Sequence, residues 1–155
     1  MAKFSNDNTN MIFEKEKING EEFVEIFEKD ETALILMGFS ACPWCQAIVP
    51  YVNEVSKADG QKTVYYLDIL DMREETSKDH EKYLKLKEII KDAVDKEKDR
   101  INGPTFVVVK NGEMVGYHLD TVSTHQMVDG VLPPMNEEQI VELKDILKKL
   151  IQKSH

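Results

Sequence analysis

Segments with two different hydrophobic periodicities alternate along the chain. Five segments carry the apolar, β-branched and aromatic side chains that are typical of strands. They are residues 11–15, which form the weakest candidate, and residues 33–39, 62–69, 105–110 and 113–119. The last two flank Asn111-Gly112, a dipeptide that favours the type I′ turn of a tight hairpin.

Apolar side chains at helical spacing predict four helical segments. They cover residues 21–29, with Asn19 as the capping residue, and residues 43–58, 71–100 and 136–151. The third segment holds ten acidic and nine basic side chains in mixed order, which is typical of a solvated helix face. Residues 121–135 show no periodicity and contain Pro133-Pro134, so we expect a loop there.

The order of these elements predicts an α/β fold in one domain that covers residues 1–155. A β-α-β start requires a right-handed crossover between parallel strands, whereas a hairpin is antiparallel, so the central sheet should be mixed. Helices are expected on both faces of this sheet. The charged segment 71–100 is then an extended helical insertion.

Charge and hydropathy exclude several function classes. The chain has 20 Lys and Arg against 29 Asp and Glu, a net charge of −9 that argues against nucleic acid as a ligand. The longest apolar run, residues 33–39, is far shorter than the ~18 residues of a membrane span. The first ten residues lack the apolar core of a secretory signal, so we expect a cytoplasmic protein, or an extracytoplasmic one if a signal has been trimmed.

The two cysteines of the chain, Cys42 and Cys45, enclose Pro43-Trp44 where a buried strand meets a helix. Proline is favoured at the first helical position, so Cys42 should cap the helix and Cys45 should lie on the same face. A helix N-terminus favours the thiolate by up to ~2 kcal/mol, which would bring the pKa of Cys42 from about 8.5 to roughly 7. This arrangement predicts thiol–disulfide exchange, with Trp44 partly exposed beside the attacking sulfur.

Two other uses of cysteine are disfavoured. A zinc site needs four ligands, usually with a second Cys pair or a His-x₃₋₅-His pair, and the four histidines contain no such pair. A cysteine protease needs a histidine base; only His118 or His125 could approach Cys42, and nothing in the sequence places them there. We therefore expect no metal, and we interpret the histidines at 80, 118, 125 and 155 as surface or incidental residues.

Three stretches together resemble the thioredoxin superfamily over nearly the whole chain. They are ALILMGFSACPWCQAIVPYVNEV, NGPTFVVVKNGEMVG and the C-terminal amphipathic helix. The resemblance implies the thioredoxin fold, with Cys42 as nucleophile and Cys45 as resolving thiol. It also implies that Pro104 is a cis-proline that faces the cysteines, and that Gly103, Pro104, Thr105 and Trp44 bind substrate. Many relatives carry Thr or Val before this proline, so Gly103 suggests a more open groove.

The chain departs from thioredoxin in two respects. Leu36 and Tyr66 occupy the positions where thioredoxins carry a buried acid and its lysine, so we expect slower or differently controlled resolution by Cys45. Pro-Trp replaces Gly-Pro between the cysteines, which predicts a couple more oxidising than that of thioredoxin. The glutathione-site pattern of glutaredoxins is absent from the sequence.

Among thioredoxin-like proteins, the charged segment and the loop at 121–135 are most similar to bacterial bacteriocin-transport accessory proteins. We expect a monomeric thiol–disulfide oxidoreductase that needs no cofactor and acts on protein or peptide thiols and disulfides. The alternative is a non-catalytic binding protein for an exported peptide such as a bacteriocin precursor, with the cysteines as a redox clip.

Overall fold

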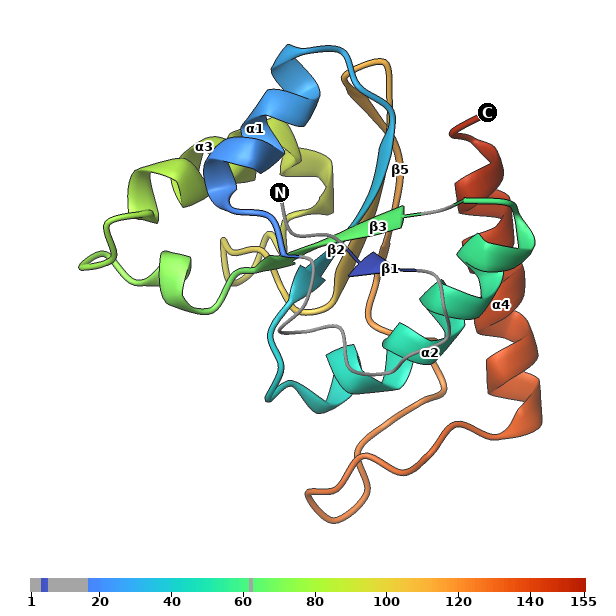
Figure 1. The fold of residues 1–155 in the computed structure, drawn as a ribbon. Coiled ribbons are helices and arrows are strands. Elements are labelled where there is room, and N and C mark those ends of the chain that lie inside the picture. The colour runs from blue at the N-terminus through green and yellow to red at the C-terminus, as the bar shows by residue number, and fades with distance from the viewer. Residues whose placement is uncertain (1–3, 6–16, 62) are drawn as a thin grey trace.

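A central β-sheet separates two pairs of helices (Figure 1). This computed structural model describes residues 4–5, 17–61 and 63–155. The described residues form a five-stranded sheet in the order β1-β3-β2-β4-β5. The strands are β1 (Phe4–Ser5), β2 (Ala33–Gly38), β3 (Thr63–Asp68), β4 (Thr105–Lys110) and β5 (Glu113–Leu119). The helices are α1 (Gly20–Glu28), α2 (Pro43–Ala58), α3 (His80–Ile89) and α4 (Glu137–Gln152), with short 3₁₀ turns η1 (Asp71–Arg73) and η2 (Lys91–Ala93).

The sheet is mixed, as the sequence predicts. Strand β2 pairs in parallel with β3 and antiparallel with β4, and β4 pairs antiparallel with β5. Because β2 lies between β3 and β4, its carboxyl end, where Gly38 leads into the cysteine segment, is flanked by both strands. The cysteines therefore follow directly from the carboxyl end of a central strand.

Alternating side chains of β2 supply the two hydrophobic cores. Leu34 and Leu36 point into the core that α2 and α4 cover, whereas Ile35 and Met37 point into the core that α1 covers. All four side chains are buried, which explains why this strand is an almost continuous apolar run. Figure 1 shows the two helical pairs on opposite faces, so the prediction of helices on both faces is confirmed.

The predicted hairpin turn is present, but the pairing of its two strands shifts by one residue along their length. Asn111 and Gly112 have φ angles of 50° and 77°, as a type I′ turn requires. A β-bulge between Val108 and Val109 then shifts the pairing, so that Thr105 lies opposite Leu119. Every residue of β5 beyond the bulge is therefore displaced by one position relative to β4.

The prediction of one long helix over residues 71–100 is wrong. The segment contains η1, α3 and η2, and its carboxyl end is a tight turn in which residues 95 and 100 form a bridge. The Asp95 side chain accepts the backbone N–H groups of Glu97 and Lys98, a pattern that competes with helix formation. Tyr83 of α3 accepts the Ile101 backbone N–H at 3.0 Å, so the segment folds back against its own helix.

Other expectations have mixed outcomes. The helix predicted to be capped by Asn19 is present, with Asn19 and Glu22 forming a capping box. Residues 121–135 contain no helix or strand element, as expected of a loop. The strand candidate at 11–15 lies outside the described residues. In the part of the chain that the structure describes, no helix has both the length and the apolar character needed to cross a membrane.

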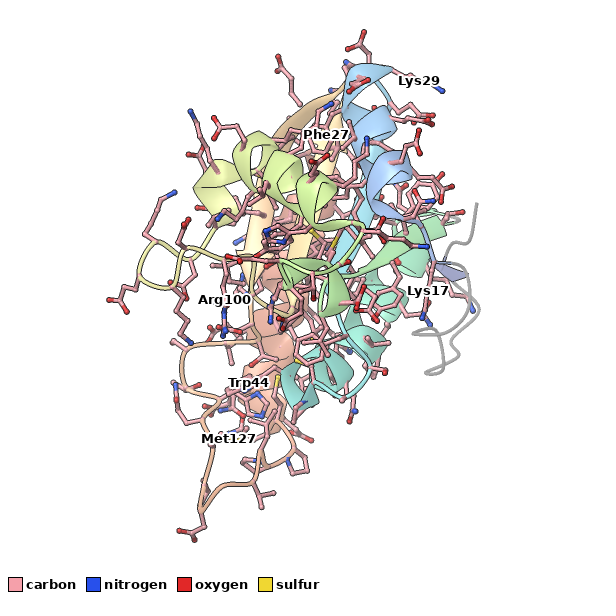
Figure 2. The ribbon with its side chains drawn as sticks, turned by 90° about the vertical axis from the view of Figure 1, so that its left-hand side faces the viewer. Lys17, Phe27, Lys29, Trp44, Arg100 and Met127 are labelled. Atoms are coloured by element: carbon pink, nitrogen blue, oxygen red, sulfur yellow. The ribbon has the colours of Figure 1, made fainter. Side chains whose placement is uncertain are left out.

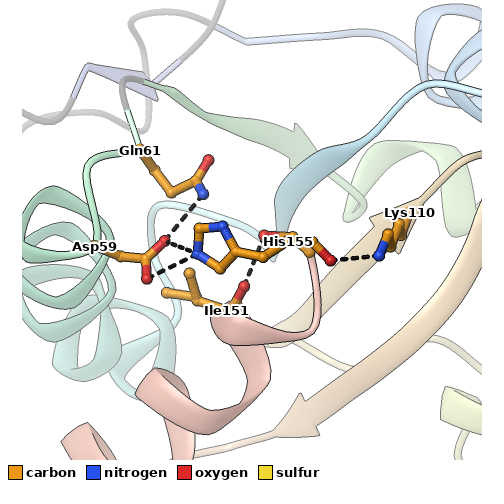
Figure 3. Close-up of polar contacts among 6 residues, drawn as sticks. Asp59, Gln61, Lys110, Ile151 and His155 are labelled. Carbon is orange, nitrogen blue, oxygen red and sulfur yellow. Dashed lines mark hydrogen bonds and ion pairs between the residues drawn. The ribbon is translucent and has the colours of Figure 1, made fainter.

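The last residue of the sequence joins α4 to the end of α2 (Figure 3). His155 Nε2 lies 2.9 Å from Asp59 Oδ2, and the Gln61 amide donates to the same carboxylate oxygen at 3.0 Å. Burial opposes ionisation of Asp59, but the hydrogen bonds from Gln61 and His155 outweigh it and lower the pKa of Asp59. The His155 backbone oxygen also accepts a hydrogen bond from Lys110 of β4.

Replacing Gly112 with Ala should destabilise the protein by about 2 kcal/mol or more. Its φ of +77° disfavours a side chain, and a Cβ there would lie 2.6 Å from the Phe27 carbonyl oxygen. Gly130 is the matched control, because it has the same φ of +77° and nothing within 4 Å of an added Cβ. Gly130→Ala should therefore cost only about 1 kcal/mol. Equal free energies of unfolding for the two variants, measured in urea, would show that the contact at Gly112 is unimportant.

Candidate functional site

The two cysteines lie at the N-terminus of α2. Cys42 is the N-cap residue and Pro43 the first helical residue, as the sequence predicts. The backbone N–H of Cys45 donates to Cys42 Sγ at 3.2 Å, so the first turn of the helix points a donor directly at the sulfur. Both cysteines are free, and their exposed fractions are 4% for Cys42 and 0% for Cys45.

Two glycines make room for the Cys45 sulfur. A Cβ on Gly38 would lie 2.6 Å from Cys45 Sγ, and a Cβ on Gly103 would lie 3.0 Å from the same atom. The Gly103 position is also crowded by Phe39, whose Cε1 atom would be 3.1 Å away. The expectation that Gly103 opens the groove is therefore wrong, because Cys45 and Phe39 occupy the space that a side chain would take.

The segment that precedes β4 faces the cysteines. The Gly103–Pro104 peptide bond is cis, as the resemblance implies, and Cys42 Sγ donates to the Gly103 carbonyl oxygen at 3.5 Å. Thr105 is buried, and its hydroxyl donates to the Asn102 carbonyl at 2.7 Å. Gly103 and Pro104 thus lie next to the cysteines, whereas the Thr105 side chain is directed into its own loop.

The two thiols have very different affinities for protons. A hydrogen bond from the Cys45 thiol is the largest cause that lowers the pKa of Cys42 to about 7; burial opposes it, and the amides of Cys45 and Trp44 add to it. The same hydrogen bond and burial raise the pKa of Cys45. Sequence reasoning predicted the shift of Cys42 from the helix N-terminus, but it missed the larger contribution of the neighbouring thiol. Cys42 is therefore the more acidic thiol of the pair, and Cys45 holds its proton at neutral pH.

Trp44 is half-buried and connects the cysteines to the loop at 121–135. Its ring meets the His125 ring edge-on, with 5.1 Å between the centroids. Figure 2 labels Trp44 and Met127 at the same end of the molecule, where this loop projects. His125 is only 2% exposed, and it bonds the Thr121 hydroxyl at 2.7 Å and the Pro133 carbonyl at 2.7 Å. The interpretation of His125 as a surface residue is therefore wrong.

Leu36 and Tyr66 lie opposite each other on β2 and β3, as the departure from thioredoxin implies. Both are fully buried in the core that contains the cysteines. Burial raises the pKa of Tyr66, and the negative charges of Asp68 and of the cysteines raise it further. Neither side chain can accept the Cys45 proton at neutral pH.

Asp120 is the acidic side chain beside the cysteines that sequence reasoning missed. Its backbone N–H donates to the Pro104 carbonyl at 3.2 Å, which fixes it across from the cis-proline. Partial desolvation raises the pKa of Asp120, and its negative charge in turn raises the pKa of both cysteines. Simple hairpin register from the Asn111-Gly112 turn would place Leu119 opposite Pro104; the β-bulge puts Asp120 there instead. The described residues contain no cluster of three or more His, Cys, Asp or Glu that could hold a metal ion.

The chain has the thioredoxin fold: a mixed sheet between two helical pairs, two cysteines that open a helix, and a cis-proline before the next strand. It is similar to thioredoxin from Plasmodium falciparum, with 20% identity and a TM-score of 0.49 over 88% of this chain and 95% of that one. Thioredoxin pre-protein from Schistosoma mansoni gives 18% and 0.43 over 87% and 94%. Mitochondrial thioredoxin 3 from Saccharomyces cerevisiae gives 16% and 0.43 over 66% and 78%. No model of a protein family and no curated protein sequence matches the chain.

Replacing Asp120 with Asn should lower the pKa of Cys42, because a negative charge that disfavours the thiolate is removed. The measurement is the rate of alkylation of the reduced protein against pH, whose midpoint should move below about 7. Asp129→Asn is the matched control. Asp129 has a φ of 50° and Asp120 a φ of 58°, so Asn fits both backbones equally well, and Asp129 lies in the projecting loop. Identical midpoints for the two variants would contradict the assigned influence of Asp120.

Proposed function

We propose that this protein is a thiol–disulfide oxidoreductase of the thioredoxin superfamily that acts on protein or peptide disulfides. The observation that carries the proposal is the asymmetric thiol pair at the start of α2. Cys42 has a pKa of about 7, and Cys45 behind it holds its proton. An arrangement of this kind is suited to one attacking thiolate and one resolving thiol.

In the first step, the Cys42 thiolate attacks one sulfur of a substrate disulfide. The Cys42–substrate bond forms, the substrate S–S bond breaks, and the second substrate sulfur leaves as a thiolate. Deprotonation of Cys42 also ends its hydrogen bond to the Gly103 carbonyl. That carbonyl is then free to accept a backbone N–H of the substrate, which supports the role of Gly103, Pro104 and Thr105 as the substrate-positioning loop.

In the second step, Cys45 loses its proton and attacks Cys42 Sγ. The Cys42–Cys45 bond forms, the mixed disulfide breaks, and the second substrate thiolate leaves and takes up a proton. Two electrons pass from the protein dithiol to the substrate; the reverse sequence oxidises a substrate dithiol. Once Cys42 is in the mixed disulfide it carries no negative charge, so one cause of the raised pKa of Cys45 is removed.

The low pKa of Cys42 affects the reduction potential of the Cys42–Cys45 pair more than the rate of attack. At pH 7, a thiol of pKa about 7 is roughly half thiolate, against about 3% for one of pKa 8.5. The thiolate fraction is thus roughly fifteenfold larger, but each thiolate is about fivefold less nucleophilic because the thiol is more acidic. The rate of attack is therefore only about threefold higher. Stabilising the Cys42 thiolate also stabilises the reduced protein. A pKa of about 7 equals that of the thioredoxin nucleophile, so a potential more oxidising than that of thioredoxin stays a prediction from Pro43-Trp44.

Trp44 adds a half-buried aromatic surface beside Cys42, on which an apolar side chain of the substrate would pack. The finer expectations remain predictions from the sequence. They are the bacteriocin-transport accessory subtype, a bacteriocin precursor as partner, a cytoplasmic location and a monomeric state.

Replacing Cys45 with Ala should raise the pKa of Cys42 above about 7, because its strongest hydrogen-bond donor is lost. The variant should also accumulate a mixed disulfide with substrate, since no second thiol can release it. Alkylation against pH and non-reducing mass spectrometry of a reaction with a model disulfide protein measure the two effects.

Cys42→Ser is the companion variant and should give neither turnover nor a mixed disulfide. The wild-type protein should reduce the model substrate faster than an equal concentration of free dithiol. If it does not, and if Cys42→Ser still binds its partner, the protein is a binding module and the oxidoreductase proposal fails.

A further inference from the structure

A cleft of about 390 Å³ opens beside the cysteines, between Trp44 and the charged segment 71–100. Phe39, Trp44 and Gly103 form its inner side. Arg73, Lys98 and Arg100 contribute cationic groups to its lining. Arg100 and Trp44 are both labelled in Figure 2, where Arg100 lies above Trp44.

None of the three cations of the cleft forms a close ion pair in the described structure, although the charge of Lys98 acts on Asp95 and Asp120. In the described part of the chain, the ion pairs of basic side chains involve other residues, at positions 29, 85, 87, 144, 149 and 155. Arg73 donates to the Ile101 carbonyl at 2.6 Å and lies over the Phe39 ring, 5.6 Å from its centroid. Arg100 donates from Nε to the Asn102 side chain at 2.9 Å. These neutral contacts hold the two guanidinium groups in place without an ion pair.

The guanidinium groups of Arg73 and Arg100 also repel each other. Burial lowers the pKa of Arg73, and the charge of Arg100 lowers it further. Like charges held together are favourable only when an anion comes between them. In a chain of net charge −9, a group of unpaired cations is a local exception to the overall charge.

Two acidic side chains also line the cleft, and neither forms an ion pair with these cations in the described structure. Both oxygens of Asp95 accept hydrogen bonds from its own turn: Oδ1 from the Glu97 and Lys98 amides, and Oδ2 from the Asn102 amide group. Asp120 lies on the side of the cleft next to the cis-proline. These two carboxylates offset part of the charge of Lys98, whereas Arg100 has only the neutral Asn102 side chain as a partner and remains available to a ligand.

We propose that this cleft selects substrates that carry an acidic side chain next to the reacting cysteine, with Arg100 and Lys98 receiving the carboxylate. This inference rests on the proposed function, because it assigns a specificity to the same site. The ligand is a peptide segment, since the cleft is continuous with Gly103, where the substrate backbone would pair. A planar guanidinium group binds a carboxylate through two parallel hydrogen bonds.

The test compares three disulfide-linked peptides that differ only beside the cysteine, where they carry Glu, Gln or Lys. Wild-type protein should give a kcat/KM that is about three- to tenfold higher for the Glu peptide than for the Gln peptide, and lowest for the Lys peptide. Oxidised glutathione serves as a further probe. A preference for it over the Glu peptide would assign the carboxylate to a small disulfide and overturn the peptide assignment.

The double variant Lys98→Gln/Arg100→Gln should bring the Glu-to-Gln ratio close to one, and Lys98→Gln alone, which keeps the Arg100–Asn102 hydrogen bond, should lower it in part. Lys91→Gln/Lys96→Gln is the matched control. It removes the same charge from the same segment, but neither lysine lines the cleft, so it should keep the wild-type ratio. A ratio near one in the wild type, or an equal fall in the control, would overturn the inference.

A binding measurement separates failure of the inference from failure of the proposed function. Titration of the Cys42→Ser protein with reduced peptides, followed by Trp44 fluorescence, needs no turnover. If the Glu peptide binds preferentially but is not turned over, the inference of a selective cleft stands and the oxidoreductase proposal fails. If the peptides are turned over but the Glu and Gln peptides bind equally, the oxidoreductase proposal stands and the inference fails.

Discussion

The site depends on how the Cys42 sulfur is bonded at the start of α2. The Cys45 amide donates to it from the helix backbone, and the Cys45 thiol lowers its pKa from one turn away. Both donors come from the same residue, so any change that moves Cys45 also changes the reactivity of Cys42. Gly38 and Gly103 pack closely around the Cys45 sulfur and so hold it in position. Through Cys45 they also influence the pKa of Cys42.

The order of the elements could be predicted because each has a local pattern. Strand β2 is apolar throughout, Asn19 and Asn136 begin helices with capping boxes, and Asn111-Gly112 makes the hairpin turn. Cys42 and Cys45 could be placed for the same reason, since Pro43 marks the helix start. The position of cis-Pro104 came from the resemblance and not from any physical property of the residues around it.

The features that could not be predicted depend on contacts between distant segments. The helical spacing of 71–100 is real for α3, but the turn that Asp95 closes and the contact of Tyr83 with Ile101 divide the segment. The β-bulge at Val108 and Val109 moves Asp120 by one position, and no pattern in the sequence marks it. The sequence around His125 does not indicate its burial either, because the burial results from contacts with Trp44 and with Thr121 and Pro133 of its own loop.

The hydrogen bonds of His125 fix the form of its ring. The Pro133 carbonyl can only accept a hydrogen bond, so Nε2 carries the proton, and in the neutral ring Nδ1 accepts from the Thr121 hydroxyl. The wall on this side of Trp44 includes the Glu142 carboxylate, whereas the wall on the other side carries guanidinium groups. A polypeptide substrate of the proposed reaction would meet a different wall on each side of its cysteine, so the two directions in which it could cross the site would differ in energy.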